Sequence, residues 1–163
     1  MSDSIKGLDS FLKKLNTLQA EVAKEVTKQV KREGKAVQGN AKQLCPVNKY
    51  GTGGELRQSI KEKTEIEDSL IRSTVFTTKK YAGYVELGTG PIGQDNHEGI
   101  SPEVNPTYSQ KGWTYYDSEL DKFIHTKGQP AQPYMYPALK DYEEVVTKNI
   151  KVAVKAGLKK VCK

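Results

Sequence analysis

Residues 8–44 read LDSFLKKLNTLQAEVAKEVTKQVKREGKAVQGNAKQL, a stretch without proline that sets the longest element of the fold. Apolar residues recur along it mostly at steps of three and four, which places them on one stripe of an α-helix. The stripe consists of Leu8, Phe11, Leu12, Leu15, Leu18, Val22, Val26, Val30, Val37, Ala41 and Leu44. At 1.5 Å per residue this helix runs roughly 50 Å, longer than the diameter of a domain of this size. Part of the stripe therefore needs cover from elsewhere, which favours self-association.

The end of this helix and the segment after it are marked by glycine and proline. Gly34 and Gly39 lower the helix propensity of the last third. Pro46 ends the helix, because a residue that precedes proline disfavours helical backbone angles. A glycine turn at residues 51–54 then opens a short helix, for which Thr52 is the candidate N-cap.

Short strands and irregular segments follow. Residues 59–66 and 70–77 have strand patterns separated by a tight turn at 67–69. Residues 81–87 predict a single helical turn that Gly88-Thr89-Gly90 breaks, and residues 90–133 are expected to be irregular. Within that irregular part, two segments can pair as a hairpin across 117–121, namely Trp113-Thr-Tyr-Tyr116 and Lys122-Phe-Ile-His-Thr126.

One last helix closes the chain, with Pro137 in its first turn, where proline is well tolerated. The whole order predicts the α+β class. We expect a long N-terminal helix and a C-terminal helix packed on a small antiparallel sheet, with a long loop or hairpin excursion.

A length of 163 residues predicts one domain, residues 1–163, with residues 1–7 as a flexible arm. Residues 90–128 form a long insertion that we expect to face a partner. Hydrophobic residues make up only 36%, so the core is thin. The sequence contains no run of about eighteen apolar residues, so we expect no membrane span. The N-terminus lacks the apolar core of a signal peptide. Cys45 and Cys162 stand in no ligand spacing and are expected to be reduced thiols of a cytosolic product.

The net charge of +6 is unevenly distributed. Residues 1–44 carry nine bases and five acids, and residues 134–163 carry seven and three, so both ends have a net charge of +4. Residues 81–133 carry three bases and seven acids, a net charge of −4. Solvated helix faces are the simplest explanation of the basic residues, and the alternatives are head-to-tail docking between copies and contact with DNA phosphates.

The chain offers no convincing catalytic, cofactor or metal site. The turn at 51–54 lacks the Gly-Lys-Ser/Thr that a phosphate-binding loop needs, because Glu55 and Leu56 follow it. Glu86 has no second acid or base spaced to work with it, so we expect its carboxylate to accept N–H bonds from the glycine turn or to pair with Arg57 or Arg72. A metal-dependent hydrolase would use Asp95, His97 and Glu98, but their loop shows no frame to hold three ligands.

The last helix supplies the candidate nucleic-acid contacts. Its lysines are spaced at three and four residues and form a basic stripe: Lys148, Lys151, Lys155 and Lys159. Lysine meets phosphate as a point charge, and arginine, the favoured reader of base edges, is missing from this helix. The alternative function is therefore a DNA-binding protein without sequence preference.

Three motifs follow the long helix in a fixed order. They are Thr52-Gly-Gly-Glu-Leu-Arg-Gln-Ser-Ile60, Tyr81-Ala-Gly-Tyr-Val-Glu-Leu-Gly-Thr89 and Pro133-Tyr-Met-Tyr-Pro-Ala-Leu139. Together they resemble the tail-component family of tailed bacteriophages that is typified by the tenth gene product of a lambdoid coliphage. The family patterns are TGxLRxSI, Y…YVExGT and P(Y/F)(M/L)xPAL.

The resemblance implies a structural protein of the virion, made in the cytoplasm of the bacterial host. It would act at the neck, in head–tail joining or in tail completion, as a ring around the axis of DNA passage, commonly with six-fold symmetry. Its partners would be its own copies and other neck and tail proteins, with no catalytic residues, no cofactor and no membrane. The candidate structural and interface residues on the motifs and the insertion are Arg57, Tyr81, Tyr84, Glu86, Gly88, Trp113, Tyr134, Tyr136 and Pro137.

Overall fold

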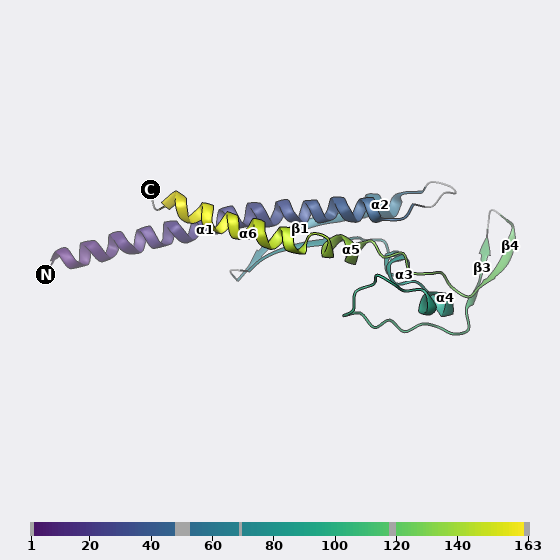
Figure 1. The fold of residues 1–163 in the computed structure, drawn as a ribbon. Helices are drawn as coiled ribbons and strands as arrows, with labels where there is room; N and C mark the ends of the chain where they lie inside the picture. The colour runs from purple at the N-terminus through teal and green to yellow at the C-terminus, as the bar shows by residue number, and fades with distance from the viewer. Residues whose placement is uncertain (1, 48–52, 69, 118–119, 162–163) are drawn as a thin grey trace. The chain divides into compact units, whose positions relative to one another are not determined.

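The computed structural model describes residues 2–47, 53–68, 70–117 and 120–161. The elements follow one another in the order α1 (Ser2–Leu44), α2 (Glu55–Ser59), β1 (Lys61–Glu67), β2 (Leu70–Phe76), α3 (Ala82–Leu87), α4 (Gly90–Asp95), β3 (Trp113–Asp117), β4 (Lys122–Thr126), α5 (Met135–Lys140) and α6 (Glu143–Val161) (Figure 1). Within the described residues the strands form two two-stranded sheets, β1–β2 and β3–β4. Helices combined with small sheets confirm the predicted α+β class.

The predicted N-terminal helix is confirmed over its whole length. α1 contains 43 residues and at 1.5 Å per residue extends about 65 Å, longer than the sequence-based expectation. It ends at Leu44, directly before Cys45 and Pro46, as the proline rule predicts. None of the helices in the described part of the chain is both long and apolar enough to cross a bilayer.

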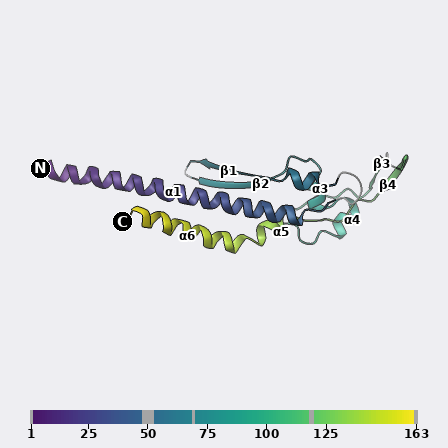
Figure 2. The ribbon, with the colours of Figure 1, turned by 90° about the horizontal axis from the view of Figure 1, so that it is seen from above.

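The middle turns of α1 lie between two other elements, with the β1–β2 hairpin on one side and α6 on the other (Figure 2). Gly157 of α6 faces Val22 so closely that an added Cβ would lie 2.7 Å from the Val22 Cα. On the hairpin side, a Cβ at Gly34 would lie 1.9 Å from the Ser73 Oγ. Gly34, expected only to weaken the helix, is therefore a point of close approach to the strand.

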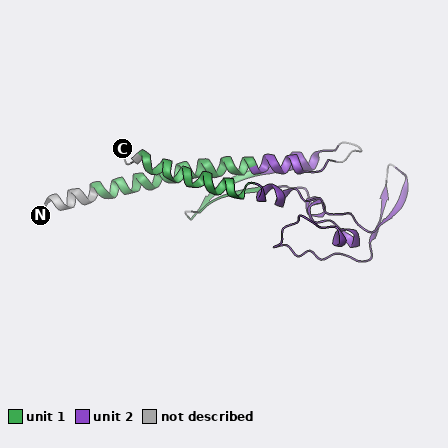
Figure 3. Ribbon diagram, viewed as in Figure 1, with its two compact units in different colours: residues 1–36, 62–75, 142–163 green, residues 37–61, 76–141 purple. Residues whose placement is uncertain are grey.

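The division into two compact units runs through these elements (Figure 3). Unit 1 comprises residues 1–36, 62–75 and 142–163, and unit 2 comprises residues 37–61 and 76–141. The expectation of a single domain stays a prediction. Unit 1 holds most of α1, the β1–β2 hairpin and α6, whereas unit 2 holds all three sequence motifs.

Polar contacts complete the packing of unit 1. Glu33 is only 6% exposed, and its carboxylate accepts hydrogen bonds from the amides of Gln29 and, at 2.8 Å, Asn149 on α6. Farther along, Lys160 forms an ion pair with Glu25 at 2.6 Å. Contacts between α6 and α1 extend toward the N-terminus of α1 as far as Val22. The first turns of α1, purple in Figure 1, project past α6.

A row of apolar side chains on the N-terminal turns of α1 lacks cover in unit 1. Phe11 is 60%, Leu12 46% and Leu15 49% exposed, and Leu18 is half-buried. These four residues are called the α1 face below. They belong to the predicted stripe, and the first turns of α1 extend beyond the end of α6 (Figure 1). The expected excess of apolar helix surface is thus present.

The short strands agree with the sequence patterns. β1 and β2 correspond to the predicted strands 59–66 and 70–77, with Asp68 at a positive φ of 46° beside the turn. β3 and β4 form the predicted second hairpin, in a register that pairs Tyr115 with Ile124. Thr52, the expected N-cap of the short helix α2, lies outside the described residues. Cys162 also lies outside them.

Two expectations about the second half of the chain are wrong. Residues 90–133 are not irregular throughout, because Gly90–Asp95 form α4, whose first turn contains Pro91. The last helix is not continuous: α5 ends at Lys140, and α6 begins at Glu143. At the break, the Asp141 carboxylate accepts a hydrogen bond of 3.2 Å from the Asn40 amide of α1, a long-range contact that periodicity does not reveal.

The contact between α6 and α1 gives a test of the packing in unit 1. Gly157→Ala places a methyl group against the backbone of Val22. We expect the overpacking to destabilise the protein by about 1–3 kcal/mol in spite of the better helix propensity of alanine, measured by urea unfolding.

Gly39→Ala is the matched control, since a Cβ there meets nothing within 4 Å. It should leave stability unchanged or raise it by up to about 1 kcal/mol. Equal stabilisation by both substitutions would contradict the described packing of α6 on α1.

Candidate functional site

Glu86 joins the second and third motifs through its carboxylate. Its Oε2 accepts the backbone N–H groups of Tyr134 at 2.8 Å and Met135 at 3.0 Å, and its Oε1 accepts that of Tyr136 at 3.0 Å. A helix leaves its first four N–H groups without partners inside the helix, and at α5 the fourth position is Pro137, which has no N–H. One carboxylate therefore satisfies every free donor at the start of α5 with charge-assisted hydrogen bonds.

The expected partners of Glu86 are corrected by these contacts. The carboxylate does accept backbone N–H groups, but they come from the start of α5 and not from the glycine turn. Arg57 does not pair with it: the Arg57 Nη2 donates to the Cys45 carbonyl oxygen at 2.8 Å. Arg57 thereby ties the first motif to the end of α1.

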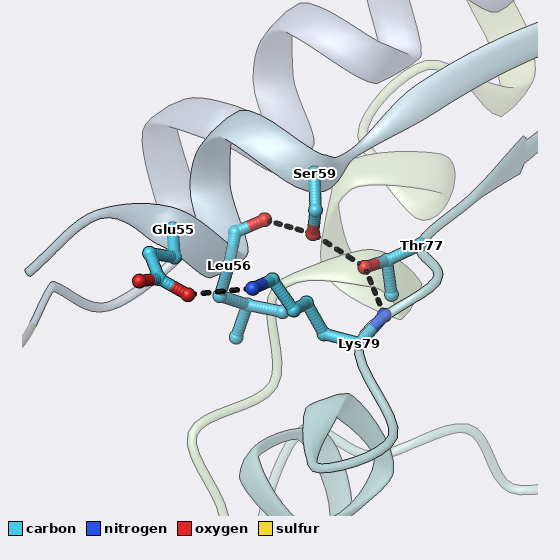
Figure 4. Close-up of polar contacts among 5 residues, drawn as sticks. All are labelled: Glu55, Leu56, Ser59, Thr77 and Lys79. Carbon is cyan, nitrogen blue, oxygen red and sulfur yellow. Dashed lines mark hydrogen bonds and ion pairs between the residues drawn. The ribbon is translucent and has the colours of Figure 1, made fainter.

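The first motif is also fastened to the segment that follows β2 (Figure 4). The Ser59 Oγ donates to the Leu56 carbonyl oxygen at 2.7 Å and shares a hydrogen bond of 2.6 Å with the Thr77 Oγ1. The Lys79 ammonium lies 2.5 Å from the Glu55 carboxylate, at an exposed position. The polar residues of the first motif therefore form hydrogen bonds and an ion pair within the chain.

Gly88 and its neighbours let two backbone segments meet. Thr89 and Gln129 exchange backbone hydrogen bonds of 2.9 and 3.1 Å as an isolated antiparallel bridge. Gly88 has a φ of 75°, and a Cβ there would lie 2.7 Å from the Ala131 nitrogen. Glycine is required because a side chain would separate the segments.

The core of unit 2 is built from motif residues. Tyr134 is 1% exposed, and Ile60 and Cys45 are fully buried with it. Burial raises the pKa of both the Tyr134 hydroxyl and the Cys45 thiol. Tyr134 is thus a core residue of this chain, and its neighbours Tyr136 and Pro137 are half-buried.

An open groove of about 820 Å³ lies on unit 2 beside this core. Four aromatic residues line it: Tyr81, Tyr84, Tyr108 and Trp113. Tyr84 is 62% exposed, and Tyr81 and Trp113 are each 42% exposed. Gly88 also lines this surface, which is called the aromatic groove below. The structure thus brings four of the predicted interface residues to one place.

Tyr108 is the groove residue that sequence reasoning missed. Its hydroxyl donates to the Leu87 carbonyl oxygen at 2.7 Å, and its ring stacks on His97 with centroids 5.9 Å apart. Tyrosine in an insertion without periodicity gives no signal of such a contact. The stacking also shows where His97 lies: against an aromatic ring.

The metal-site alternative gains nothing from the geometry. Asp95, His97 and Glu98 are exposed, and in the described ranges no three His, Cys, Asp or Glu side chains are grouped as metal ligands. The lysine stripe is present as predicted, with Lys148, Lys151, Lys155 and Lys159 exposed on α6. Glu143 and Glu144 share the same surface of α6 with three of these lysines.

The Glu86 contacts predict a large effect of one substitution. Glu86→Ala leaves three backbone donors without their acceptor, so we expect a loss of about 2–4 kcal/mol in the free energy of unfolding. Glu98→Ala, at an exposed loop position, is the control and should change stability by less than about 0.5 kcal/mol. Similar melting temperatures for both variants would show that the carboxylate does not hold α5.

Tyr134 predicts a pH dependence at the alkaline end. Its pKa in the folded protein is raised by burial, so the folded state keeps the proton when the unfolded state releases it. The contribution to stability is present below the ordinary tyrosine pKa of about 10 and is lost as the pH rises above it. Between about pH 8 and 11, the free energy of unfolding measured with urea should fall less steeply with pH for Tyr134→Phe than for the wild type. Parallel curves would contradict the burial of the hydroxyl.

Comparison with known proteins gives one family match. Residues 9–88 match the model of the HK97-gp10-like family, described as "Bacteriophage HK97-gp10, putative tail-component". Searches of curated proteins and of solved structures gave no match. The matched region contains α1 from Asp9 onward, the first motif and the second motif as far as Gly88, with Glu86. Over residues 9–88 the chain is thus similar to the HK97-gp10-like family of bacteriophage tail components, which agrees with the resemblance seen in its motifs.

Proposed function

We propose that this protein is a structural, non-enzymatic component of the virion of a tailed phage or prophage. It acts at the neck, in head–tail joining or tail completion, by assembling with its own copies into a ring. The family match over residues 9–88 supports a structural role in a phage tail. The ring, its six-fold symmetry and the position at the neck extend that role. The ring is supported by the surfaces described next, whereas the symmetry and the neck position follow from the resemblance of the motifs alone.

The α1 face is the observation that carries the proposal. Three large apolar side chains stand about half exposed or more in a row on one helix. Burying the part of each side chain that is still exposed would contribute roughly 1 kcal/mol. A soluble monomer rarely keeps such a row in water, and assembly with other subunits removes it.

The distribution of charge favours a ring over a symmetric pair. The N-terminal 44 residues carry +4 and residues 81–133 carry −4, so different parts of the chain attract each other in neighbouring copies. A contact between two different surfaces is heterologous, and it closes into a ring when the rotation between subunits allows.

The functions of the motif residues also support a structural role. Glu86, Arg57 and Gly88 are engaged in holding backbone segments of unit 2 together. Residues that react with a substrate need free polar atoms directed at it, whereas the polar side-chain atoms of Glu86 and Arg57 are bonded to the backbone of unit 2.

A second contact, with DNA passing along the ring axis, is favoured by the exposed lysines of α6. Such a contact would meet phosphates only and would weaken steeply with salt. The acidic pair Glu143 and Glu144 on the same surface reduces its net charge, so DNA binding is the lesser of the two candidate functions.

Removal of the gene from the phage tests the function. We expect lysates with filled heads and tails that remain unjoined by electron microscopy, and a loss of infectious particles. Expression of the wild-type protein in the host should restore joined virions. Normal, infectious virions in the absence of the protein would refute the proposal.

The same complementation assay tests the role of the α1 face. Phe11→Ser/Leu15→Ser removes two exposed side chains and should fail to restore infectivity. Val152→Ser, which removes a 59% exposed side chain from α6, is the control and should complement as the wild type does. Full complementation by both variants would show that assembly does not use this face.

A further inference from the structure

We propose that the α1 face of one copy docks in the aromatic groove of a second copy. This inference rests on the proposed function and names the two surfaces that meet in the ring. The groove lies on unit 2 and the face on unit 1.

The aromatic groove is suited to apolar side chains. Its volume of about 820 Å³ and its exposed rings of Tyr81, Tyr84 and Trp113 are typical of sites that bury apolar groups. Two backbone carbonyls along it already have donors: the Tyr108 hydroxyl bonds to Leu87, and the Gln129 amide bonds to Tyr84 at 3.1 Å. An apolar occupant therefore leaves these two carbonyls satisfied.

The groove is also held in shape before anything binds. Gly88 is packed against the backbone of residues 129–131, and the Thr89–Gln129 bridge closes the same junction. A surface that needs little ordering on binding loses less entropy, which favours a defined interface.

The α1 face has the spacing of a helix that docks in a groove. Phe11, Leu15 and Leu18 stand at positions i, i+4 and i+7, the anchor pattern of this mode of recognition. Lys13 and Lys14 are exposed and flank the apolar residues. The segment 10–20 contains these two bases and no acid.

The net charge of the segment that forms the groove favours a second copy as the occupant. The residues that line the groove are uncharged, but all of them come from positions 81–129, within the segment 81–133 that carries three bases and seven acids. The basic flanks of the α1 face complement that segment, which adds long-range attraction to apolar contact. Because the face and the groove differ, each docked pair leaves one free face and one free groove, and further copies can add.

Trp113 makes the docking measurable, because it is the only tryptophan of the chain and it lines the groove. An acceptor variant, Phe11→Ser/Leu15→Ser, keeps the groove and loses the face. A donor variant, Tyr84→Ser/Trp113→Ser, keeps the face and contributes no tryptophan emission. Adding donor to acceptor should shift the emission to shorter wavelength, saturate at one donor per acceptor, and give a dimer and nothing larger by light scattering.

Two further full-length variants serve as controls. A donor that also carries Phe11→Ser/Leu15→Ser should produce no shift. A donor that also carries Lys13→Glu/Lys14→Glu, at two exposed positions, should bind the acceptor roughly tenfold more weakly or worse. Added salt should weaken the binding of the original donor to the acceptor. Circular dichroism should show wild-type helix content for each chain.

Two results overturn the docking: an unchanged emission spectrum with the original donor, or the same shift from the donor without its face. Either result would leave the proposed virion function standing, because that function is judged by particles that lack the protein. Normal particles without the protein would refute the function even if the isolated chains dock as described.

Discussion

The carboxylate of Glu86 is the contact on which unit 2 depends. α5 begins with three free N–H groups and a proline, and the two oxygens of Glu86 accept all three. This arrangement fixes α3 against the start of α5, and the Gly88 junction next to it then brings residues 129–131 alongside. The aromatic groove is formed from this same region, so its shape follows from a few backbone contacts and one charged side chain.

The motifs of unit 2 and the uncovered α1 face have complementary parts in the proposed assembly. The motif residues use their polar atoms within the chain, and what they expose is aromatic surface. α1 in turn carries more apolar surface than unit 1 covers, beginning where the contacts with α6 end. In the proposed assembly the apolar projection of one copy fills the apolar recess of the next, and the tail-component role by which the matched family is described agrees with that proposal.

The sequence alone predicted the elements that follow from local patterns. Helix α1 and both hairpins were predictable because apolar periodicity, turn residues and Pro46 act over a few residues. The partner of Glu86, the break between α5 and α6 and the place of Tyr108 were not, since each depends on contacts between distant residues such as Asn40 and Asp141. Tyr84 and Trp113 were expected at an interface, and the structure shows that they line one groove; whether a partner enters it stays a prediction.

The central claim is that the protein is built into the virion as a ring of copies joined face to groove. Reconstruction of the head–tail junction of purified virions by electron cryomicroscopy tests it most directly. The predicted result is a closed ring in which the first turns of α1 from each subunit end in the aromatic groove of its neighbour. A junction without density for this chain, in particles whose protein content also lacks it, would contradict the claim.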